Sequence, residues 1–365
     1  MESIFEPFAQ RIRIACERAT PLRIRGGGTK DFYGERLEGE LLATAPLAGI
    51  TSYEPTELVV TVLAGTPLAQ LERTLAERGQ CLPFEPPHFG AGATVGGMAA
   101  AGLSGPARAS AGAVRDYVLG VTIVNGRGEL LTFGGQVMKN VAGYDVSRVM
   151  TGALGTLGLI LEVSLKVLPV PPGQATLKFE LKQADALQRL NTWGGQPLPL
   201  NASCWVEDNG LGTLYLRMRG ALAAVESACK SLGGERQDEA QVAGHWDACR
   251  EQRLPWFEQR ADRDLWRLSV PQTAPVLDLP EPPLVEWHGG QRWVRAEPGQ
   301  AEHLRRTASQ AGGHATLFAP APGRAEPASG RFAPLGSPLD RIHRDLKREF
   351  DPAGILNRGR LYPQF

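Results

Sequence analysis

The chain has 365 residues, and its 39 Lys and Arg balance its 39 Asp and Glu, so that it carries no formal net charge. This balance argues against a protein that binds a nucleic-acid backbone, which needs a basic surface, whereas the length and the 42% of hydrophobic residues suit two globular domains. The 43 glycines and 28 prolines exceed the average shares of about 7% and 5%, and 16 of the glycines fall within residues 90–160.

The longest stretch without Asp, Glu, Lys or Arg, residues 86–107, consists mostly of Gly, Ala, Ser and Pro. It therefore lacks the strongly apolar residues that a membrane span needs. The N-terminal run Met1-Glu2-Ser3-Ile4-Phe5-Glu6 has acids where a signal peptide has positive charge. We expect a cytoplasmic protein with no transmembrane segment, and expect any contact with the inner membrane to be made through partners.

Short strands alternate with helices in the first 170 residues. The run 58–63 is β-branched and continuously apolar, which predicts a buried strand. Thr66 and Pro67 predict the start of a helix that ends at Gly79. An Asn-Gly turn between 121–125 and 130–133 predicts a hairpin. Further strands are predicted at 22–24 and 157–168.

Prolines at 169, 171 and 172 predict a linker, after which strands and helices continue. Strands are predicted at 203–208, 213–219, 284–288 and 292–296, and helices at 221–232, 298–310 and 338–350. We expect the last helix to bury Leu339, Ile342, Leu346 and Phe350. This pattern predicts an α+β protein with domains at 1–170 and 171–335, and with residues 336–365 returning to the first domain.

The first glycine cluster, Arg25-Gly26-Gly27-Gly28-Thr29-Lys30, directly follows a predicted strand. Consecutive glycines let backbone N–H groups converge on an anion, and Thr29 adds a hydroxyl donor. The run matches neither the P-loop pattern nor the dinucleotide-binding fingerprint. A phosphate-binding loop and a plain turn both remain open.

Three more segments follow. In Ala93-Thr94-Val95-Gly96-Gly97-Met98, bare backbone amides suit a planar or diphosphate ligand, with tight packing of small residues as the alternative. Arg115-Asp116-Tyr117-Val118-Leu119-Gly120 leads into the predicted hairpin. The fourth segment is Gly143-Tyr144-Asp145, followed by the run from Gly152 through Gly158 to Ile160.

In this order and spacing, the four segments resemble the FAD-binding domain of the vanillyl-alcohol oxidase / p-cresol methylhydroxylase (PCMH) superfamily. The tail at 350–361, Phe-Asp-Pro-Ala-Gly-Ile-Leu-Asn-Arg-Gly-Arg-Leu, resembles the closing segment of its D-lactate dehydrogenase-like branch. Within that branch, the chain length and the segment 139–145 are most similar to the FAD-binding E-type subunits of bacterial glycolate oxidase.

The resemblance implies a two-subdomain PCMH-type FAD-binding domain at 1–170, an α+β cap or partner-binding domain at 171–335, and a C-terminal helix and tail at 336–365. It implies noncovalent FAD. The residues implied to hold the cofactor are Arg25, Gly26, Gly27, Gly28, Thr29 and Lys30 around the diphosphate; Thr94, Gly96 and Gly97 along the flavin and ribityl chain, with Arg115 and Asp116 nearby; Gly158 and Ile160 on the pyrimidine or adenine side; and Asn357 and Arg360 over the isoalloxazine. A plain C-terminal clamp is the alternative for the last two.

The resemblance also implies a function. It suggests a flavoprotein subunit of a glycolate oxidase that converts glycolate and related 2-hydroxy acids to 2-oxo acids and passes the electrons to an acceptor. The implied partners are a D-type flavoprotein subunit and an iron–sulfur subunit.

The chain departs from its relatives at Leu154 and Leu161, where they more often carry polar residues, and at Arg358, which replaces their usual proline. It also lacks the H-x-G-D-G-N-x-H segment that supplies the metal-binding histidines of catalytic relatives. Its six histidines have no two-ligand spacing, and its five cysteines form no CxxC pair, so we expect no metal site and assign no catalytic residue. Two alternatives stay open: a self-sufficient FAD-dependent 2-hydroxy acid dehydrogenase and a non-catalytic scaffold with a degenerate flavin site. The first would draw its substrate arginine from Arg217, Arg219 or Arg292. Three tryptophans, Trp205, Trp287 and Trp293, look exposed in the sequence and would suit either a substrate domain or a partner interface, with core packing as the default interpretation of each.

Overall fold

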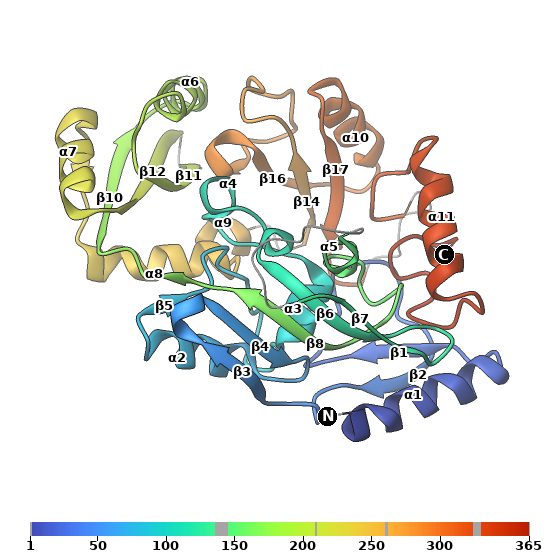
Figure 1. Cartoon of the computed structure of the whole chain (residues 1–365). Helices are drawn as coiled ribbons and strands as arrows, with labels where there is room; N and C mark the ends of the chain where they lie inside the picture. Colours follow the sequence, from blue (N-terminus) through green and yellow to red (C-terminus); the bar gives the residue numbers. More distant parts are fainter. Residues whose placement is uncertain (1, 136–144, 209, 260–261, 324–329, 365) are drawn as a thin grey trace.

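A five-stranded antiparallel sheet lies at the centre of the N-terminal lobe (Figure 1). The computed structural model describes residues 2–135, 145–208, 210–259, 262–323 and 330–364. The sheet has the strand order β3-β4-β8-β6-β7. Its strands are β3 (Ile50–Glu54), β4 (Val59–Leu63), β6 (Val118–Val124), β7 (Leu130–Gly134) and β8 (Leu159–Lys166). The predicted apolar strand, the hairpin and the strand after it are thereby confirmed.

Two helices pack against this sheet, α2 (Leu68–Ala76) and α3 (Val95–Ala101). Leu68, Leu71 and Leu75 of α2 are fully buried, as predicted. The prediction that Thr66 caps α2 was wrong. Its hydroxyl donates to the Leu63 carbonyl at 2.7 Å and accepts from the Gly49 amide at 2.9 Å, and Pro67 occupies the N-cap position.

A second, smaller subdomain has its own apolar core. It contains α1 (Glu2–Glu17) and the parallel pair β1 (Leu22–Arg25) and β2 (Glu40–Ala43). The buried side chains of this core include Phe5, Ile12 and Leu22, and they pack with residues at one end of the central strands β4, β6 and β8. Short elements complete the lobe: β5 (Gln80–Cys81) paired with β9 (Leu168–Pro169), α4 (Arg108–Ala111), α5 (Val146–Met150), η1 (Pro55–Glu57) and η2 (Val114–Asp116).

The cap lobe is built on an eight-stranded antiparallel sheet with the order β13-β10-β12-β11-β15-β16-β14-β17. Its strands are β10 (Gly173–Glu180), β11 (Leu200–Asp208), β12 (Leu211–Gly220), β13 (Glu235–Arg236), β14 (Asp264–Ser269), β15 (Leu284–Glu286), β16 (Gln291–Ala296) and β17 (His314–Ala319). Its helices are α6 (Gln183–Gly194), α7 (Leu222–Leu232), α8 (Glu239–Arg250), α9 (Pro255–Glu258), η3 (Trp287–Gly289) and α10 (Ala301–Gln310). The four strands and two helices predicted in this region are confirmed, although β15 ends at Glu286, two residues earlier than predicted.

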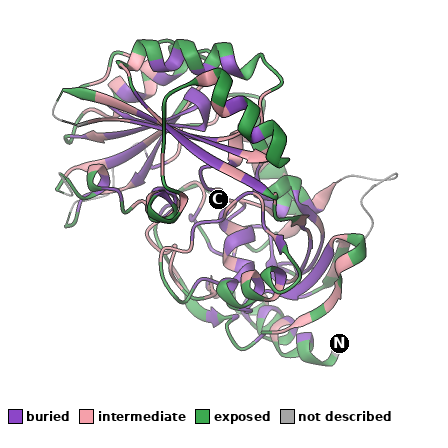
Figure 2. Ribbon diagram, turned by 90° about the vertical axis from the view of Figure 1, so that its left-hand side faces the viewer, coloured by how far each residue is buried: buried purple, intermediate pink, exposed green. Residues whose placement is uncertain are grey.

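The two faces of the cap sheet have different neighbours. Helices α6, α7 and α10 cover the face that points away from the N-terminal lobe, and their outer sides are exposed (Figures 1 and 2). On the other face, side chains of α8 and of the sheet form one buried cluster with Tyr33, Leu103 and Leu154 of the N-terminal lobe. The lobes therefore share an apolar interface.

The C-terminal segment returns to the N-terminal lobe through α11 (Leu339–Phe350) and the tail after it. Leu356 bridges to Leu22 in parallel, which extends the β1–β2 pair. The prediction that α11 buries Leu339 and Ile342 was wrong, because their side chains are 53% and 44% exposed. The helix instead contacts the lobe through its last turns, where Lys347 is buried.

Core packing, the default interpretation of the three tryptophans, is confirmed. Trp205, Trp287 and Trp293 are 1%, 8% and 3% exposed, since each lies within or against the cap sheet. The predicted α+β class and the returning tail are confirmed, and the domain bounds at 170 and 335 stay a prediction. No helix in the described ranges combines the length and apolar character needed to cross a membrane.

Candidate cofactor site

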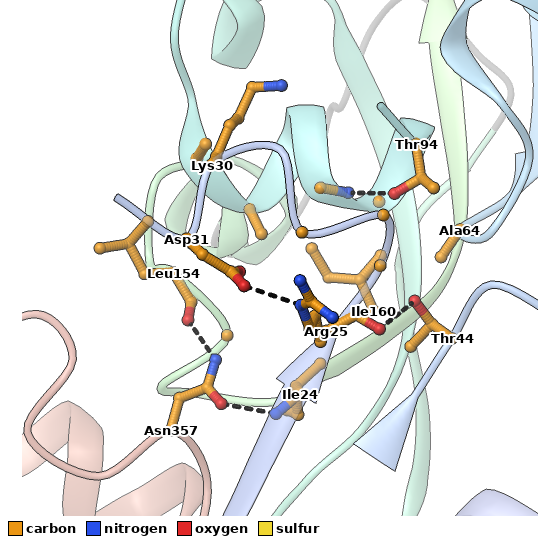
Figure 3. Close-up of a pocket in the computed structure, with 18 of the residues that line it drawn as sticks. Ile24, Arg25, Lys30, Asp31, Thr44, Ala64, Thr94, Leu154, Ile160 and Asn357 are labelled. Atoms are coloured by element: carbon orange, nitrogen blue, oxygen red, sulfur yellow. Dashed lines mark hydrogen bonds and ion pairs between the residues drawn. The ribbon is translucent and has the colours of Figure 1, made fainter. Parts of the chain in front are cut away.

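A groove of about 730 Å³, a volume that includes the solvent space at its open mouth, lies where the two N-terminal subdomains and the C-terminal tail meet (Figure 3). The groove brings together the following residues predicted from sequence: Arg25, Gly26, Gly27, Gly28, Thr29, Lys30, Thr94, Gly96, Gly97, Ile160, Asn357 and Arg360. These residues come from four separate segments of the chain, which meet here.

The first wall is the loop that follows β1. Arg25 Nε donates to Asp31 Oδ2 at 2.7 Å, and this ion pair closes the loop at its base (Figure 3). Gly28 has φ +75°, and a Cβ there would lie 2.1 Å from the Arg25 guanidinium. A Cβ on Gly27 would lie 1.5 Å from the carbonyl oxygen of Gly92. Glycine is therefore required here by contacts within the chain itself, independently of any ligand.

The second wall is the first turn of α3. Thr94 is the N-cap residue, and its hydroxyl accepts from the Gly97 amide at 3.2 Å. A Cβ on Gly96 would lie 2.6 Å from the Cβ of Ala64, so this glycine serves the packing of α3 on β4. A Cβ on Gly97 would approach only the Thr94 hydroxyl, at 3.1 Å, and would otherwise enter the groove.

Gly97 is the position at which the fit of a ligand can be judged. The sequence has a side-chain-free residue where the protein has room for a side chain, which leaves the backbone of α3 open to a molecule in the groove. The rest of the wall is apolar at Ala64, Ala100, Leu154 and Ile160, with the Thr44 hydroxyl beside it. Bare amides beside apolar walls suit a diphosphate with flat ring systems, and FAD fits this description.

Asn357 joins three segments at one end of the groove. Its Oδ1 accepts from the Ile24 amide and its Nδ2 donates to the Leu154 carbonyl, both at 2.7 Å (Figure 3). The residue has φ +40°, a conformation that asparagine tolerates better than most residues. Its amide therefore fixes the tail against β1 and the 152–158 loop.

Arg360 fixes the other side of the tail. Its buried guanidinium donates to the carbonyls of Asp31 at 2.8 Å and Lys30 at 3.3 Å, and also to those of Tyr33 and Glu35. These contacts place its positive charge under the loop that carries Lys30. Both tail residues thus act first as clamps, which was the alternative open for them.

The Lys30 side chain extends from the loop away from Asn357 (Figure 3). Its ammonium donates to the His88 carbonyl at 3.2 Å. Burial lowers the pKa of Lys30 to about 8, and the carboxylate of Glu251 acts in the opposite direction. A lysine held this way carries a proton that titrates near neutral pH.

Three predicted residues lie outside the groove lining. Arg115 and Asp116 belong to η2, and the Asp116 carboxylate accepts from the Ala113 amide at 2.8 Å. Gly158 is buried against β6, where a Cβ would lie 3.0 Å from a methyl carbon of Ile123. Of the segment 139–145, only Asp145 lies within the described residues.

Sequence reasoning also missed part of the lining. These residues are Ile24, Asp31, Leu37, Thr44, Ala64, Ala100, Ala101, Leu154 and Gly155. Ile24 and Asp31 flank the first glycine cluster and could have been included on that ground. Thr44 and Ala64 directly follow β2 and β4, which approach the groove only through tertiary contacts, and no local pattern marks them.

The arginines considered for substrate binding are already engaged. Arg217 and Arg219 donate to the Glu85 carboxylate at 2.7 and 2.8 Å, which ties the cap to the N-terminal lobe. Burial alone would raise the pKa of Glu85, but the charges of the two arginines outweigh it and hold that pKa below its usual value. Arg292 is fully buried and donates to the carbonyl oxygens of Gly289 and Ala274.

Comparisons with known proteins agree with this geometry. A profile of the family described as "FAD binding domain" matches residues 6–134. The glycolate oxidase subunit GlcE of Escherichia coli (strain K12) is 43% identical over 356 residues, which are 97% of this chain and 96% of that protein. The glycolate oxidase subunit GlcD of Bacillus subtilis (strain 168) is 31% identical over 177 residues, which are 48% of this chain and 37% of that protein.

Among solved structures, an alkyldihydroxyacetonephosphate synthase superposes with a TM-score of 0.63 at 15% identity and covers 96% of this chain and 73% of that chain. At this identity the likeness concerns the fold alone. The profile match and the relatives identify FAD as the cofactor class, as expected from the sequence.

Proposed function

Because this chain belongs to the family of the glycolate oxidase subunit GlcE, we propose that it is the FAD-binding flavoprotein subunit of an assembly that oxidises glycolate and related 2-hydroxy acids to 2-oxo acids. The observation that carries this proposal is the groove that opens at Gly97, in a chain related over nearly its whole length to such a subunit.

The proposal assigns FAD to the groove and gives the chain's own residues distinct tasks. The backbone of residues 26–28 and the first turn of α3, with Gly97, bind the diphosphate, since side-chain-free amides can approach an anion closely. Ala64, Leu154 and Ile160 exclude water from the rings. Asn357 and Arg360 position the loops that form the walls. When bound, FAD supplies a flavin ring that accepts the reducing equivalents of a 2-hydroxy acid.

The attachment of FAD is proposed to be noncovalent. His88 is the histidine closest in sequence to the groove-lining loop at 93–97, and its Nε2–H donates to Glu72 Oε2 at 2.9 Å. Its imidazole is therefore held against α2, and Lys30 contacts only its carbonyl. Arg115, Asp116 and Gly158 are proposed to shape the neighbouring backbone and to support cofactor binding from outside the groove lining.

The proposed partners are a D-type flavoprotein subunit and an iron–sulfur subunit. A relative named as the D subunit of glycolate oxidase matches about half of this chain, so the two kinds of subunit share a domain. A shared FAD-binding domain suits an assembly in which two flavoproteins pass electrons along one path. We propose that the whole assembly, and not this chain alone, oxidises the 2-hydroxy acid. The proposed location is the cytoplasm, with any contact to the inner membrane peripheral and made through the partners.

The test separates this reading from a self-sufficient dehydrogenase. The chain is purified alone and in complex with its D-type flavoprotein partner, and each sample is mixed with glycolate without oxygen. The proposal expects flavin bleaching at a rate at least tenfold higher in the complex. Equal bleaching by the isolated chain would contradict the subunit reading, and a flavin-free chain that takes up no FAD would leave only the scaffold reading.

A further inference from the structure

We propose that a second cavity, between α4 of the N-terminal lobe and β14 of the cap, binds a small carboxylate through Arg108 and Arg267. The cavity has about 910 Å³, a volume that includes the solvent space at its open mouth. Its N-terminal wall includes Ser104 and Arg108, and its cap wall includes Arg267, Ser269 and His314. The inference deepens the proposed function, and only the identity of the carboxylate rests on that function.

The cavity lies close to the cofactor groove because both use the same helix. Gly97, Ala100 and Ala101 of α3 line the groove, and Gly102, the C-cap residue of α3, lines the second cavity. At a rise of about 1.5 Å per residue, Gly97 and Gly102 are separated by about 8 Å along the helix. A ligand in the second cavity would therefore lie near one in the groove.

Positive charge in this cavity lacks a counter-ion. Neither Arg108 nor Arg267 forms an ion pair with any carboxylate in the described part of the chain. Burial lowers the pKa of Arg108, and the charges of Arg267 and Arg115 lower it further, whereas Asp116 opposes them. Burial and the charge of Arg267 also lower the pKa of His314.

An unpaired charge that is partly removed from water is costly, so a cavity of this kind favours an anion. Guanidinium groups match a carboxylate well, because their planar N–H groups donate in pairs to its two oxygens. The hydroxyls of Ser104 and Ser269 line the same cavity and can bond to further oxygens of such a ligand.

Both arginines are held in place before a ligand arrives. The Arg108 guanidinium lies over the Trp287 ring, 4.5 Å from its centroid, and Trp287 Nε1 donates to the Gly105 carbonyl at 3.0 Å. Arg267 lies over Tyr33 and donates to its hydroxyl at 3.2 Å. The buried Nε of Arg267 has no partner. Fixed donors of this kind bind a ligand without first having to be ordered.

The backbone that carries the Trp287 ring is itself unusual. Trp287 and the next residue, His288, both have φ +54°, which is rare for bulky side chains. His288 is held by its amide, which donates to Ser203 Oγ at 2.9 Å, and by its Nε2, which lies 2.9 Å from Ser110 Oγ. Two successive residues in this conformation place the ring under Arg108, and such conformations concentrate at ligand sites.

The test uses the full chain loaded with FAD and oxalate as the probe, since oxalate has no C–H bond that a flavin could oxidise. Oxalate binding is measured by calorimetry and by the flavin difference spectrum. We expect saturable binding by the wild type and a Kd raised at least about tenfold in both Arg108→Gln and Arg267→Gln, because each loses a charge-assisted hydrogen bond. Arg341→Gln, on the exposed side of α11, is the matched control and should leave the Kd unchanged.

Arg108→Lys keeps the charge but loses the paired donors, and its Kd should lie between those of the wild type and Arg108→Gln. Wild-type FAD content and melting temperature in each variant show that folding is intact. Unchanged oxalate Kd values in the arginine variants, or no oxalate binding by the FAD-loaded wild type, would overturn the inference. Phosphate binding as tight as oxalate at equal ionic strength would overturn the assignment to carboxylates.

Glycolate and glyoxylate are then added as competitors. Displacement of oxalate identifies the carboxylate with the substrate or product of the proposed function, and failure of both to compete refutes that identification. A chain that holds FAD but binds no oxalate contradicts this inference alone. A chain that takes up no FAD contradicts the proposed function.

Discussion

Replacing Gly97 by aspartate tests the cofactor groove without disturbing the fold. The Cβ of residue 97 has room in the groove, with one contact at 3.1 Å to the Thr94 hydroxyl. The position is also the third residue of α3, where a carboxylate interacts favourably with the helix dipole and so costs the helix no stability. We therefore expect Gly97→Asp to fold normally and to bind FAD poorly.

The size of the effect follows from the charge. At an effective dielectric constant of about 20, two like unit charges about 6 Å apart repel each other by about 3 kcal/mol. A carboxylate in the groove should therefore weaken the binding of a diphosphate roughly a hundredfold. Gly27 would be the wrong position for this test, because a Cβ there meets the Gly92 carbonyl at 1.5 Å and would disrupt the loops directly.

The matched control is Gly244→Asp. Gly244 also lies inside a helix, α8, and a Cβ there meets nothing within 4 Å. Apoprotein of each variant is titrated with FAD by flavin fluorescence, and its thermal unfolding is followed by circular dichroism. A Gly97→Asp protein that melts like the wild type and binds FAD equally tightly would refute the placement of the diphosphate beside α3.

Three further predictions concern contacts that hold the groove and the lobes together. Asn357→Leu removes both hydrogen bonds of its side chain, so the free energy of unfolding in urea should fall by about 2–4 kcal/mol. Glu85→Gln breaks a buried ion pair and should lower the free energy of unfolding by about 3–5 kcal/mol. Because the pKa of Glu85 in the folded protein lies below its usual 4.5, the wild type should lose stability as the pH falls below about 4.5. Thermal melts of the variant should show less of this loss. Lys347→Met leaves Asp351 buried without its cation, 2.6 Å away in the wild type, and should cost about 3–5 kcal/mol and speed proteolysis of the tail.

Each of these predictions has an outcome that contradicts it. An Asn357→Leu protein as stable as the wild type would show that the tail is not held by its amide. Parallel acid melts of the wild type and Glu85→Gln would mean that this carboxyl is not responsible for acid sensitivity. A tail that is cleaved no faster in Lys347→Met, with the exposed-site variant Lys230→Met as control, would remove Lys347 as its anchor.

Local sequence patterns predicted most helices and strands, because the preference of a short segment for helix or strand depends largely on its own residues. The run 58–63 became β4 because β-branched apolar residues suit a strand that is buried on both faces. Local patterns failed where burial depends on which part of the fold an element packs against. The 3.6-residue periodicity of α11 suggested a buried apolar face, but only its last turns meet the lobe, and Ile342 is 44% exposed.

Contacts between residues far apart in the chain could not be predicted from the sequence. Glu85 and Arg217 are 132 positions apart, and neither segment marks the other as its partner. The strand order of the cap sheet depends on such pairings throughout.

In the candidate site, too, local patterns predicted one part and tertiary contacts determined the rest. The glycine clusters identified the two walls of the groove, yet the reason for each glycine differs from what the sequence suggested. Gly27 and Gly96 are required by close contacts with Gly92 and Ala64, whereas Gly97 leaves space in the groove. Sequence composition measures how much unusual backbone a chain uses, and only the folded structure shows which glycine serves packing and which serves a ligand.

The most direct test of the central claim is the flavin stoichiometry of the purified chain before and after acid precipitation. The account predicts about one FAD per chain, released entirely into the supernatant, with less in Gly97→Asp and an unchanged amount in Gly244→Asp. A chain without flavin even after reconstitution, or flavin that stays with the precipitated protein, would contradict it.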